Sequence, residues 1–185
     1  MGTREDLLTA ATHCLAERGY ARTTVRDIVA ASGSNLAAIN YHFGTRDALM
    51  QQAMIEATAG AVQQILDAIE SSSERQPADR LITFLRRLIV TFTDDRALWA
   101  ANIESLAQAL HSGDVQADIS EKQLEGKAAL TRMLLPDNDT DADDEIGALL
   151  WTLLDGLLVQ WLLDPKIAPS ADKVVDGLRA IAPLL

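Results

Sequence analysis

The chain has 185 residues, of which 48% are hydrophobic and 23% are charged, and it contains a single cysteine. This composition provides enough apolar residues for a packed core and excludes an extensively disordered chain, while one cysteine excludes an internal disulfide. The first residues, MGTREDLL, contain no apolar signal core, which predicts a cytoplasmic protein.

The net charge of −11 is distributed unevenly along the chain. Residues 1–50 hold five arginines and five acidic residues, so all of the excess negative charge lies in residues 51–185. Residues 19–46 hold three arginines and one aspartate. A neutral-to-basic N-terminal segment joined to an acidic body fits a DNA-binding protein whose body faces away from the phosphates.

Apolar residues recur with a helical period along almost the whole chain, and the five prolines stand at expected helix boundaries. The pattern predicts a first amphipathic helix that ends near Gly19. A second helix begins with a capping box of Thr24 and Asp27, and a short third helix follows between Asn35 and Gly44. A long fourth helix comes next.

Five further helices are expected in the remainder of the chain. They lie at about 77–93, 95–111, 115–135, 145–164 and 170–185. The sequence therefore predicts an all-α protein of about nine helices. A three-helix head, residues 1–46, continues into a larger helical body, residues 47–185.

The third helix, within SNLAAINYHFG at 34–44, has an unusual outward side. On a helical wheel its narrow buried stripe consists of Leu36, Ile39 and Phe43. The opposite side carries two alanines and Tyr41, with Asn40 and His42 on its flanks. Small side chains allow close approach to a surface, and Tyr41 and Asn40 supply hydrogen bonds, so the pattern predicts a recognition helix for the major groove. The alternative is a helix-turn-helix hairpin that merely packs inside an α-helical protein.

Residues 5–55 resemble the N-terminal domain of TetR-family transcriptional regulators. The resemblance is carried by the end of the first helix, by TTVRDIV at 23–29 and by AAINYHFGTRDAL at 37–49. Many members have a tyrosine where this chain has Asn40, and a lysine where it has Arg46, a change that keeps the charge. The resemblance implies that operator DNA is bound by Thr24, Arg26, Asn35, Ala37, Ala38, Asn40, Tyr41, His42, Thr45 and Arg46.

The resemblance also implies separate roles for these residues. Ala37, Ala38 and Tyr41 face bases, and Asn40 and His42 touch phosphates. Asn35 caps the recognition helix, and Thr24 and Arg26 open the second helix against the duplex. At the start of the fourth helix, Thr45 and Arg46 bind a phosphate through the helix N-terminus and the side-chain charge.

The segment 146–163 is apolar enough to suggest a membrane span, but Asp155 and Gln160 interrupt it, so a helix of a soluble protein is expected. Its apolar residues cover two sides, which requires partners on two faces. The second partner is a second copy of the chain, or else the helix is fully buried in a monomer. TetR-like proteins dimerise through their last two helices. The implied dimer residues are Leu150, Leu154, Leu158, Trp161, Leu162, Val174, Leu178 and Ile181.

The middle helices carry aromatic and aliphatic side chains with few polar groups, which is the usual composition of a small-molecule site. The same residues are compatible with an ordinary core, and the family resemblance favours a pocket in the body. The candidate ligand-binding residues are Phe84, Leu88, Phe92, Trp99, Asn102, Ile103, Leu106 and Trp151.

No set of residues predicts catalysis, a metal centre or a cofactor. The acidic segment 137–143 alternates like a calcium loop, but alanine stands where such a loop needs glycine and glutamate. The three histidines are far apart in sequence, and no glycine-rich phosphate loop occurs. The chain is therefore not expected to be an enzyme.

These observations together predict a one-component transcriptional repressor. It binds a palindromic operator as a homodimer and is released by a small, largely apolar effector. The alternative is a helical DNA-associated protein without an effector, acting structurally or through a protein partner.

Overall fold

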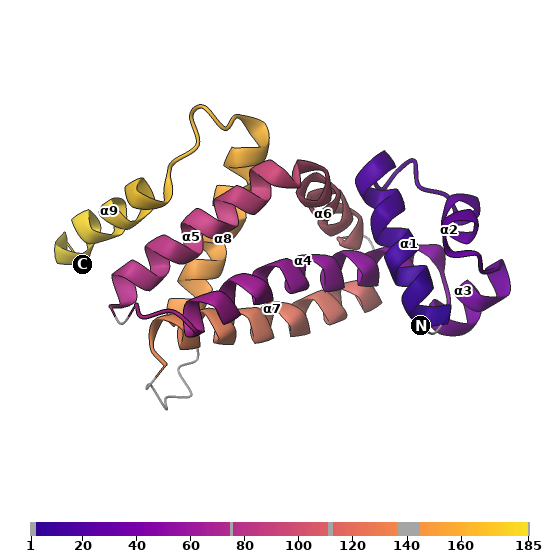
Figure 1. The fold of residues 1–185 in the computed structure, drawn as a ribbon, viewed down its shortest axis with the longest axis horizontal. Coiled ribbons are helices and arrows are strands. Elements are labelled where there is room, and N and C mark those ends of the chain that lie inside the picture. Colours follow the sequence, from indigo (N-terminus) through magenta and orange to yellow (C-terminus); the bar gives the residue numbers. More distant parts are fainter. Residues whose placement is uncertain (1–2, 75, 111–112, 137–144, 185) are drawn as a thin grey trace. The chain divides into compact units, whose positions relative to one another are not determined.

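The computed structural model describes residues 3–74, 76–110, 113–136 and 145–184, without the side chains of 113–118. These residues form nine α-helices, a short 3₁₀ turn and no strand, which confirms the all-α prediction (Figure 1). The elements are α1 (Thr3–Arg18), α2 (Val25–Ser32), α3 (Leu36–Phe43), α4 (Arg46–Glu70), α5 (Pro77–Asp94), α6 (Arg96–Ala109), α7 (Gly113–Leu134), α8 (Glu145–Leu163), α9 (Ala171–Ile181) and η1 (Ala182–Leu184). The acidic segment 137–143 lies outside the described residues.

Packing divides the described residues between two compact units. The first comprises those within Met1–Gly60 and Asp95–Ser120, and the second those within Ala61–Asp94 and Glu121–Leu185. Helix α6 therefore packs with the helix-turn-helix segment, although it follows α5 in the chain. The predicted boundary between residues 46 and 47 stays a prediction.

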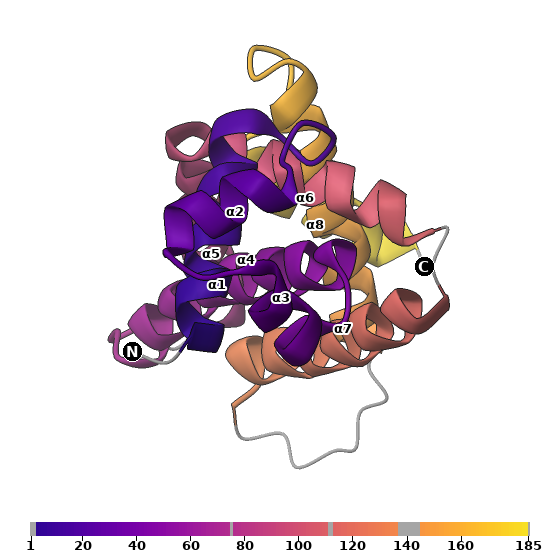
Figure 2. The ribbon, with the colours of Figure 1, turned by 90° about the vertical axis from the view of Figure 1, so that its right-hand side faces the viewer.

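The first unit is built on an apolar core to which α1, α2, α3, α4 and α6 all contribute. Helices α1, α2 and α3 lie side by side (Figure 1 and Figure 2). Helix α1 is amphipathic, as predicted, because Leu7, Leu8, Ala11 and Leu15 are all buried on one face. Ile28 of α2 and Ile39 of α3 are fully buried against this face and fix the two short helices.

Local capping explains where the short helices begin. The predicted capping box is present: Asp27 N–H donates to Thr24 Oγ1 at 3.3 Å, and Thr24 N–H donates to Asp27 Oδ2 at 2.8 Å. Asn35 Oδ1 accepts the Ala38 N–H at 2.9 Å and begins α3. The turn between α2 and α3 needs Gly33, whose φ of 65° is in the left-handed region.

The predicted buried stripe of α3 is wrong at Leu36, which is 52% exposed. Leu36 is the first residue of an eight-residue helix, so it lies at the edge of the turn rather than over the core. Ile39 is fully buried, and the half-buried Phe43 packs against the same core. Two residues therefore anchor α3 instead of three.

In the second unit, α5 packs against α8 and α9 (Figure 1). Its buried face includes Phe84, Leu85, Leu88 and Phe92, as expected for an amphipathic helix. The buried Arg80 donates from Nε to the Met133 carbonyl at the C-terminal end of α7, where the helix dipole favours a cation.

Candidate DNA-binding site

The outward face of α3 consists mainly of exposed polar side chains. Tyr41 is 85% exposed, and Asn40 and His42 are also exposed. The rings of Tyr41 and His42 meet edge to face, with 4.9 Å between centroids. Ala37 is exposed, whereas Ala38 is half-buried and packs against the core. This face offers hydrogen-bond donors and acceptors on a rigid helix, which is what reading base edges requires.

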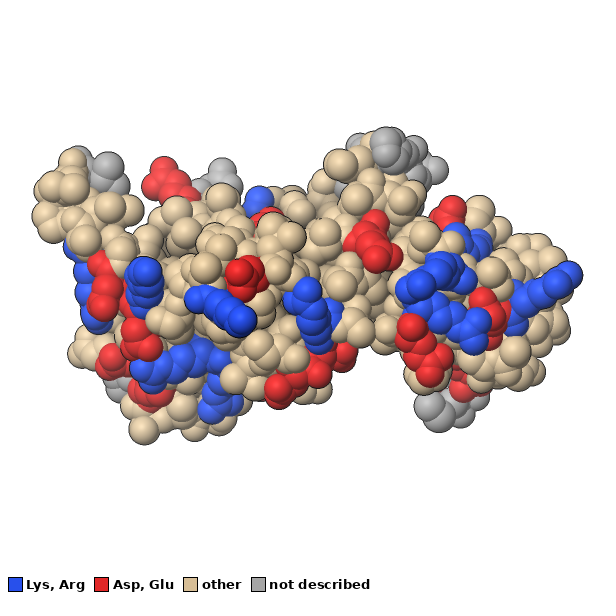
Figure 3. Space-filling model, turned by 90° about the horizontal axis from the view of Figure 1, so that it is seen from above, with Lys and Arg blue, Asp and Glu red and all other residues tan. Residues whose placement is uncertain are grey.

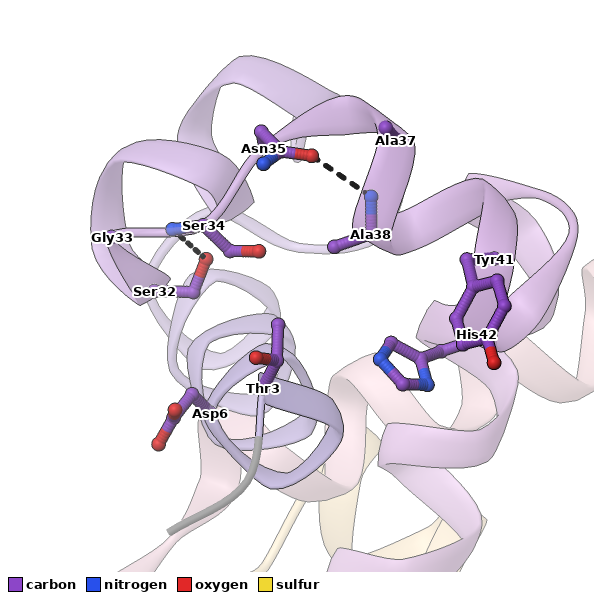
Figure 4. Close-up of a pocket in the computed structure, with 10 residues that line it drawn as sticks. All are labelled: Thr3, Asp6, Ser32, Gly33, Ser34, Asn35, Ala37, Ala38, Tyr41 and His42. Atoms are coloured by element: carbon purple, nitrogen blue, oxygen red, sulfur yellow. Dashed lines mark hydrogen bonds between the residues drawn. The ribbon is translucent and has the colours of Figure 1, made fainter.

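A hollow of about 500 Å³ adjoins this face (Figure 4). It is lined by Thr3 and Asp6 from the first turn of α1, by the α2–α3 turn, and by residues of α3. Ser34 Oγ is buried there with no hydrogen-bond partner among the described residues. Sequence reasoning missed Thr3 and Asp6, because nothing local indicates that the first turn of α1 lies beside α3.

The arginines of the first unit differ in how far they are engaged. Figure 3 shows basic and acidic side chains interspersed on the face that it draws. Arg18 forms an ion pair with Asp27, and Arg4 lies 3.5 Å from Glu56. By contrast, the exposed Arg26 makes no hydrogen bond or ion pair with any residue that the structure describes. Arg26, which is in the predicted DNA-binding set, therefore has its charge available to a phosphate.

Arg46 is held inside the first unit rather than extended into solvent. Its Nε donates to the Thr23 carbonyl at 2.8 Å, and its Nη2 donates to the Tyr20 carbonyl at 2.8 Å and also to that of Thr23. The guanidinium carbon lies 5.4 Å from the centre of the Tyr20 ring. The phosphate contact predicted for Arg46 stays a prediction. In the structure, this side chain ties the α1–α2 loop, residues 19–23, to the start of α4.

The start of α4 also carries Thr45, the second residue predicted to contact phosphate there. Its Oγ1 accepts the Ala48 N–H at 3.0 Å, and the residue is exposed. The N-terminus of α4 is therefore at the surface, where the first backbone N–H groups of a helix can meet an anion.

Ionisation supports the geometry at the start of α2. Hydrogen bonds from the hydroxyl and the amide of Thr24 lower the pKa of Asp27, and the charge of Arg18 acts in the same direction. Asp27 is therefore ionised at neutral pH, which keeps the capping box closed and orients Thr24. The hydroxyl of Thr24 donates to this carboxylate at 2.7 Å, so its predicted DNA contact shares the group with the cap.

The α1–α2 loop is also held by α6. The Tyr20 N–H donates to Glu104 Oε2 at 2.7 Å. Next to this contact, Gln51 and Ser105 form a buried reciprocal pair: Ser105 Oγ donates to Gln51 Oε1 at 2.6 Å, and Gln51 Nε2 donates to the Ser105 carbonyl at 2.7 Å. Sequence reasoning missed these residues, because their partners lie more than 50 positions away.

The predicted ligand-binding residues fall in both units. Trp99, Asn102, Ile103 and Leu106 lie on α6 in the first unit, whereas Phe84, Leu88, Phe92 and Trp151 lie in the second. Of the four candidates in the second unit, Phe84, Leu88 and Phe92 are buried and Trp151 is half-buried. A ligand site built from the whole set stays a prediction.

Trp151 brings polar atoms into the second unit. Its indole packs so closely on Gly126 that an added Cβ there would lie 2.2 Å from the ring. Its Nε1 is buried with no hydrogen-bond partner in the described part of the chain. One turn later, burial raises the pKa of Asp155, opposed by the charge of Lys127. The second unit therefore contains an unsatisfied indole donor, whereas Asp155 is an exposed residue.

The predicted dimer residues divide by burial. Leu150 and Leu158 are buried within their own chain, Leu154, Trp161, Leu162, Val174 and Leu178 are half-buried, and Ile181 is 49% exposed. The exposed row of α8 instead includes Leu149, Val159 and Leu163, spaced along one side of the helix. Of the described helices, α8 has the length and composition to cross a membrane, and 22% of its apolar window is buried. Sequence reasoning found this helix but not the side that it turns outward.

Comparison with protein families gives two matches. The model of bacterial regulatory proteins of the tetR family matches residues 7–53. The model of the tetracyclin repressor-like C-terminal domain matches residues 76–184. Together they span α3 and most of the predicted body.

Individual proteins agree with these matches. The HTH-type transcriptional regulator TtgR of Pseudomonas putida is 25% identical over 192 residues, covering 94% of this chain and 88% of that protein. Among solved structures, a putative transcriptional regulator from Rhodococcus sp. RHA1 has a TM-score of 0.73 at 18% identity, covering 97% and 94% of the two chains. The multidrug binding protein EbrR complexed with ethidium has a TM-score of 0.71 at 21% identity, covering 97% of each chain.

Proposed function

We propose that this chain, which belongs to the TetR family of transcriptional regulators, represses transcription by binding a palindromic operator as a homodimer and leaves it when a small, largely apolar effector binds. The observation that supports this most strongly is the outward face of α3. There, Asn40, Tyr41 and His42 are exposed on a helix whose other side is anchored by Ile39. The protein acts by binding rather than catalysis, in the cytoplasm.

The DNA contacts follow from what each side chain leaves free. Tyr41 and Ala37 read base edges from the major groove. Arg26, Asn40 and His42 contact phosphates, and the N-terminus of α4 at Thr45 adds backbone donors for another. Arg46 acts chiefly by positioning the head, since its donors are largely engaged by the carbonyls of Tyr20 and Thr23.

The dimer is proposed to form through α8 and α9. An exposed aliphatic row is unfavourable in water, and a second copy covers it in a two-fold arrangement. The surface proposed for the interface comprises the exposed Leu149, Val159 and Leu163 of α8 and Ile181 of α9, together with the half-buried Trp161, Leu162, Val174 and Leu178. Leu150 and Leu158 support this surface from inside the chain.

The effector is proposed to combine an aromatic or aliphatic group with a hydrogen-bond acceptor. The apolar group of the effector packs on the aromatic side chains of α5, and its acceptor satisfies the buried Trp151 Nε1. The related EbrR was solved with ethidium and with imidazole, both of which contain flat aromatic rings. This similarity supports an aromatic effector for the present chain.

Tryptophan fluorescence tests the effector. Trp99, Trp151 and Trp161 lie outside residues 1–60, so their emission reports on the body. We expect a screen of hydrophobic compounds to yield one that quenches this emission and releases operator DNA over the same concentration range. A compound that occupies the body and leaves operator affinity unchanged would support the alternative, a DNA-associated protein without an effector.

A further inference from the structure

We infer that Glu104 is a positioning residue for DNA binding: its carboxylate, on α6, holds the α1–α2 loop in the conformation that places α2 and α3 on the operator. The inference rests on the proposed function, since it explains how the helix-turn-helix segment is held in the conformation that binds DNA. It assigns a role to a residue outside both the predicted DNA-binding set and the predicted ligand-binding set.

The contact is specific in geometry. Glu104 Oε2 accepts the Tyr20 N–H at 2.7 Å, a charge-assisted hydrogen bond across 84 residues of sequence. Gly19, beside it, has a φ of 75°, and an added Cβ would lie 3.1 Å from the same oxygen. The carboxylate therefore fits closely against a loop that has no side chain at the point of contact.

The loop is held from a second side by α4. Arg46 donates to the carbonyls of Tyr20 and Thr23. Within the loop, the buried Thr23 donates its hydroxyl to the Gly19 carbonyl at 2.9 Å and to the Cys14 carbonyl at 3.1 Å. Because Thr24, the cap of α2, follows immediately, any shift of the loop moves the start of α2.

Helix α6 is fixed to α4 at the neighbouring residue. The reciprocal pair between Ser105 and Gln51 is buried, so neither side chain has water as an alternative partner. Two adjacent residues of α6 thus reach two parts of the first unit: Glu104 contacts the α1–α2 loop, and Ser105 contacts α4, the helix that follows α3. A displacement of α6 acts on both at once.

The test uses the full chain and a palindromic site chosen by in vitro selection. Three variants are compared: Glu104→Ala, which removes the acceptor; Glu104→Gln, whose amide oxygen still accepts the Tyr20 N–H; and Gln108→Ala, an exposed residue one turn along α6. The measurements are operator affinity, the preference for half-site spacing when one base pair is inserted or deleted, and amide hydrogen exchange of residues 19–24.

We expect Glu104→Ala to weaken binding about tenfold, the effect of losing one hydrogen bond to a charged group, and to reduce the spacing preference. The exchange of the Tyr20 amide should speed up by a similar factor. Glu104→Gln should recover most of the affinity and the spacing preference, and Gln108→Ala should match the unmodified protein.

Two results overturn the inference. In the first, Glu104→Ala binds as the unmodified protein does. In the second, it loses affinity equally for every spacing, in step with a loss of global stability, which indicates a merely structural contact. If the unmodified protein selects no palindromic DNA at all, the proposed function fails instead, and this outcome is seen before any variant is made.

Discussion

On α3 the exposed side chains are polar or small apart from Leu36, whereas on α8 large aliphatic side chains are exposed among polar ones such as Thr152 and Gln160. Tyr41 on α3 and Leu163 on α8 expose similar fractions, 85% and 79%. Tyr41 presents a hydroxyl to water and stands beside His42 and Asn40, while Leu163 follows Leu149 and Val159 along one row. The chemistry of each face indicates its partner: hydrogen-bonding groups suit base edges and phosphates, and an aliphatic row suits a second copy of the chain.

The largest expected effect on stability distinguishes the buried side of α8 from its exposed side. Leu158→Glu places an unpaired charge in the core and should lower the free energy of unfolding by about 3–5 kcal/mol. Leu149→Glu, on the exposed row, should leave the urea midpoint of the monomer nearly unchanged and convert dimer to monomer in analytical ultracentrifugation. A protein that sediments as a dimer with Leu149→Glu and with Leu163→Glu would rule out this face as the interface.

The next largest effect is expected at Arg46, which holds the α1–α2 loop. Arg46→Ala removes the hydrogen bonds to the carbonyls of Tyr20 and Thr23, and we expect a loss of about 2–3 kcal/mol in the free energy of unfolding, measured in urea. Arg46→Lys keeps the charge but not the planar guanidinium group that donates to both carbonyls. It should therefore recover less than half of the lost free energy of unfolding. If Arg46→Ala leaves stability intact and reduces the salt dependence of DNA binding by about one ion, Arg46 is a phosphate contact instead.

On the reading face, a change should alter sequence discrimination without altering stability. Tyr41→Ala is expected to reduce discrimination between the selected site and a one-base variant by about 1–3 kcal/mol. The midpoint of thermal unfolding should stay the same, because Tyr41 is 85% exposed. Equal weakening on all DNA would assign Tyr41 to the backbone rather than to the bases.

The capping box at the start of α2 gives the smallest effect, which depends on pH. The folded-state pKa of Asp27 is lowered, so its contribution is present above the ordinary aspartate pKa of about 4 and is lost as the pH falls through the lower folded value. Asp27→Asn should flatten the pH dependence of stability in this acidic range. Near neutrality the pH dependence of stability should be the same for both proteins. A variant with the same acid profile as the unmodified protein would show that the cap contributes nothing there.

The helices and their caps were predictable because their signals are local. Thr24 and Asp27 stand three positions apart, and Gly19 and Gly33 stop their helices through backbone conformations that other residues rarely adopt. The recognition helix was predictable for the same reason, with the exception of Leu36. Its exposure depends on how an eight-residue helix meets the core.

The hydrogen bonds that hold the α1–α2 loop were not predictable, because they join segments that are distant in the sequence. Arg46 reaches carbonyls more than 20 positions earlier, and Glu104 reaches Tyr20 across 84 positions. Both look like ordinary surface charges in the sequence. On α8, the apolar residues cover so wide an arc that the sequence leaves open which side packs inside, and the predicted dimer set included Leu150 and Leu158, which are buried within their own chain.

The central claim is that α3 reads DNA as one of two symmetric copies. The most direct measurement is selection of bound sites from random-sequence DNA by the purified protein, followed by determination of the number of protomers on the selected site. We expect two inverted half-sites with centres about one helical turn apart, or slightly more, occupied by two protomers. Selection of a motif without inverted symmetry, or binding of a single protomer to the full site, would contradict it.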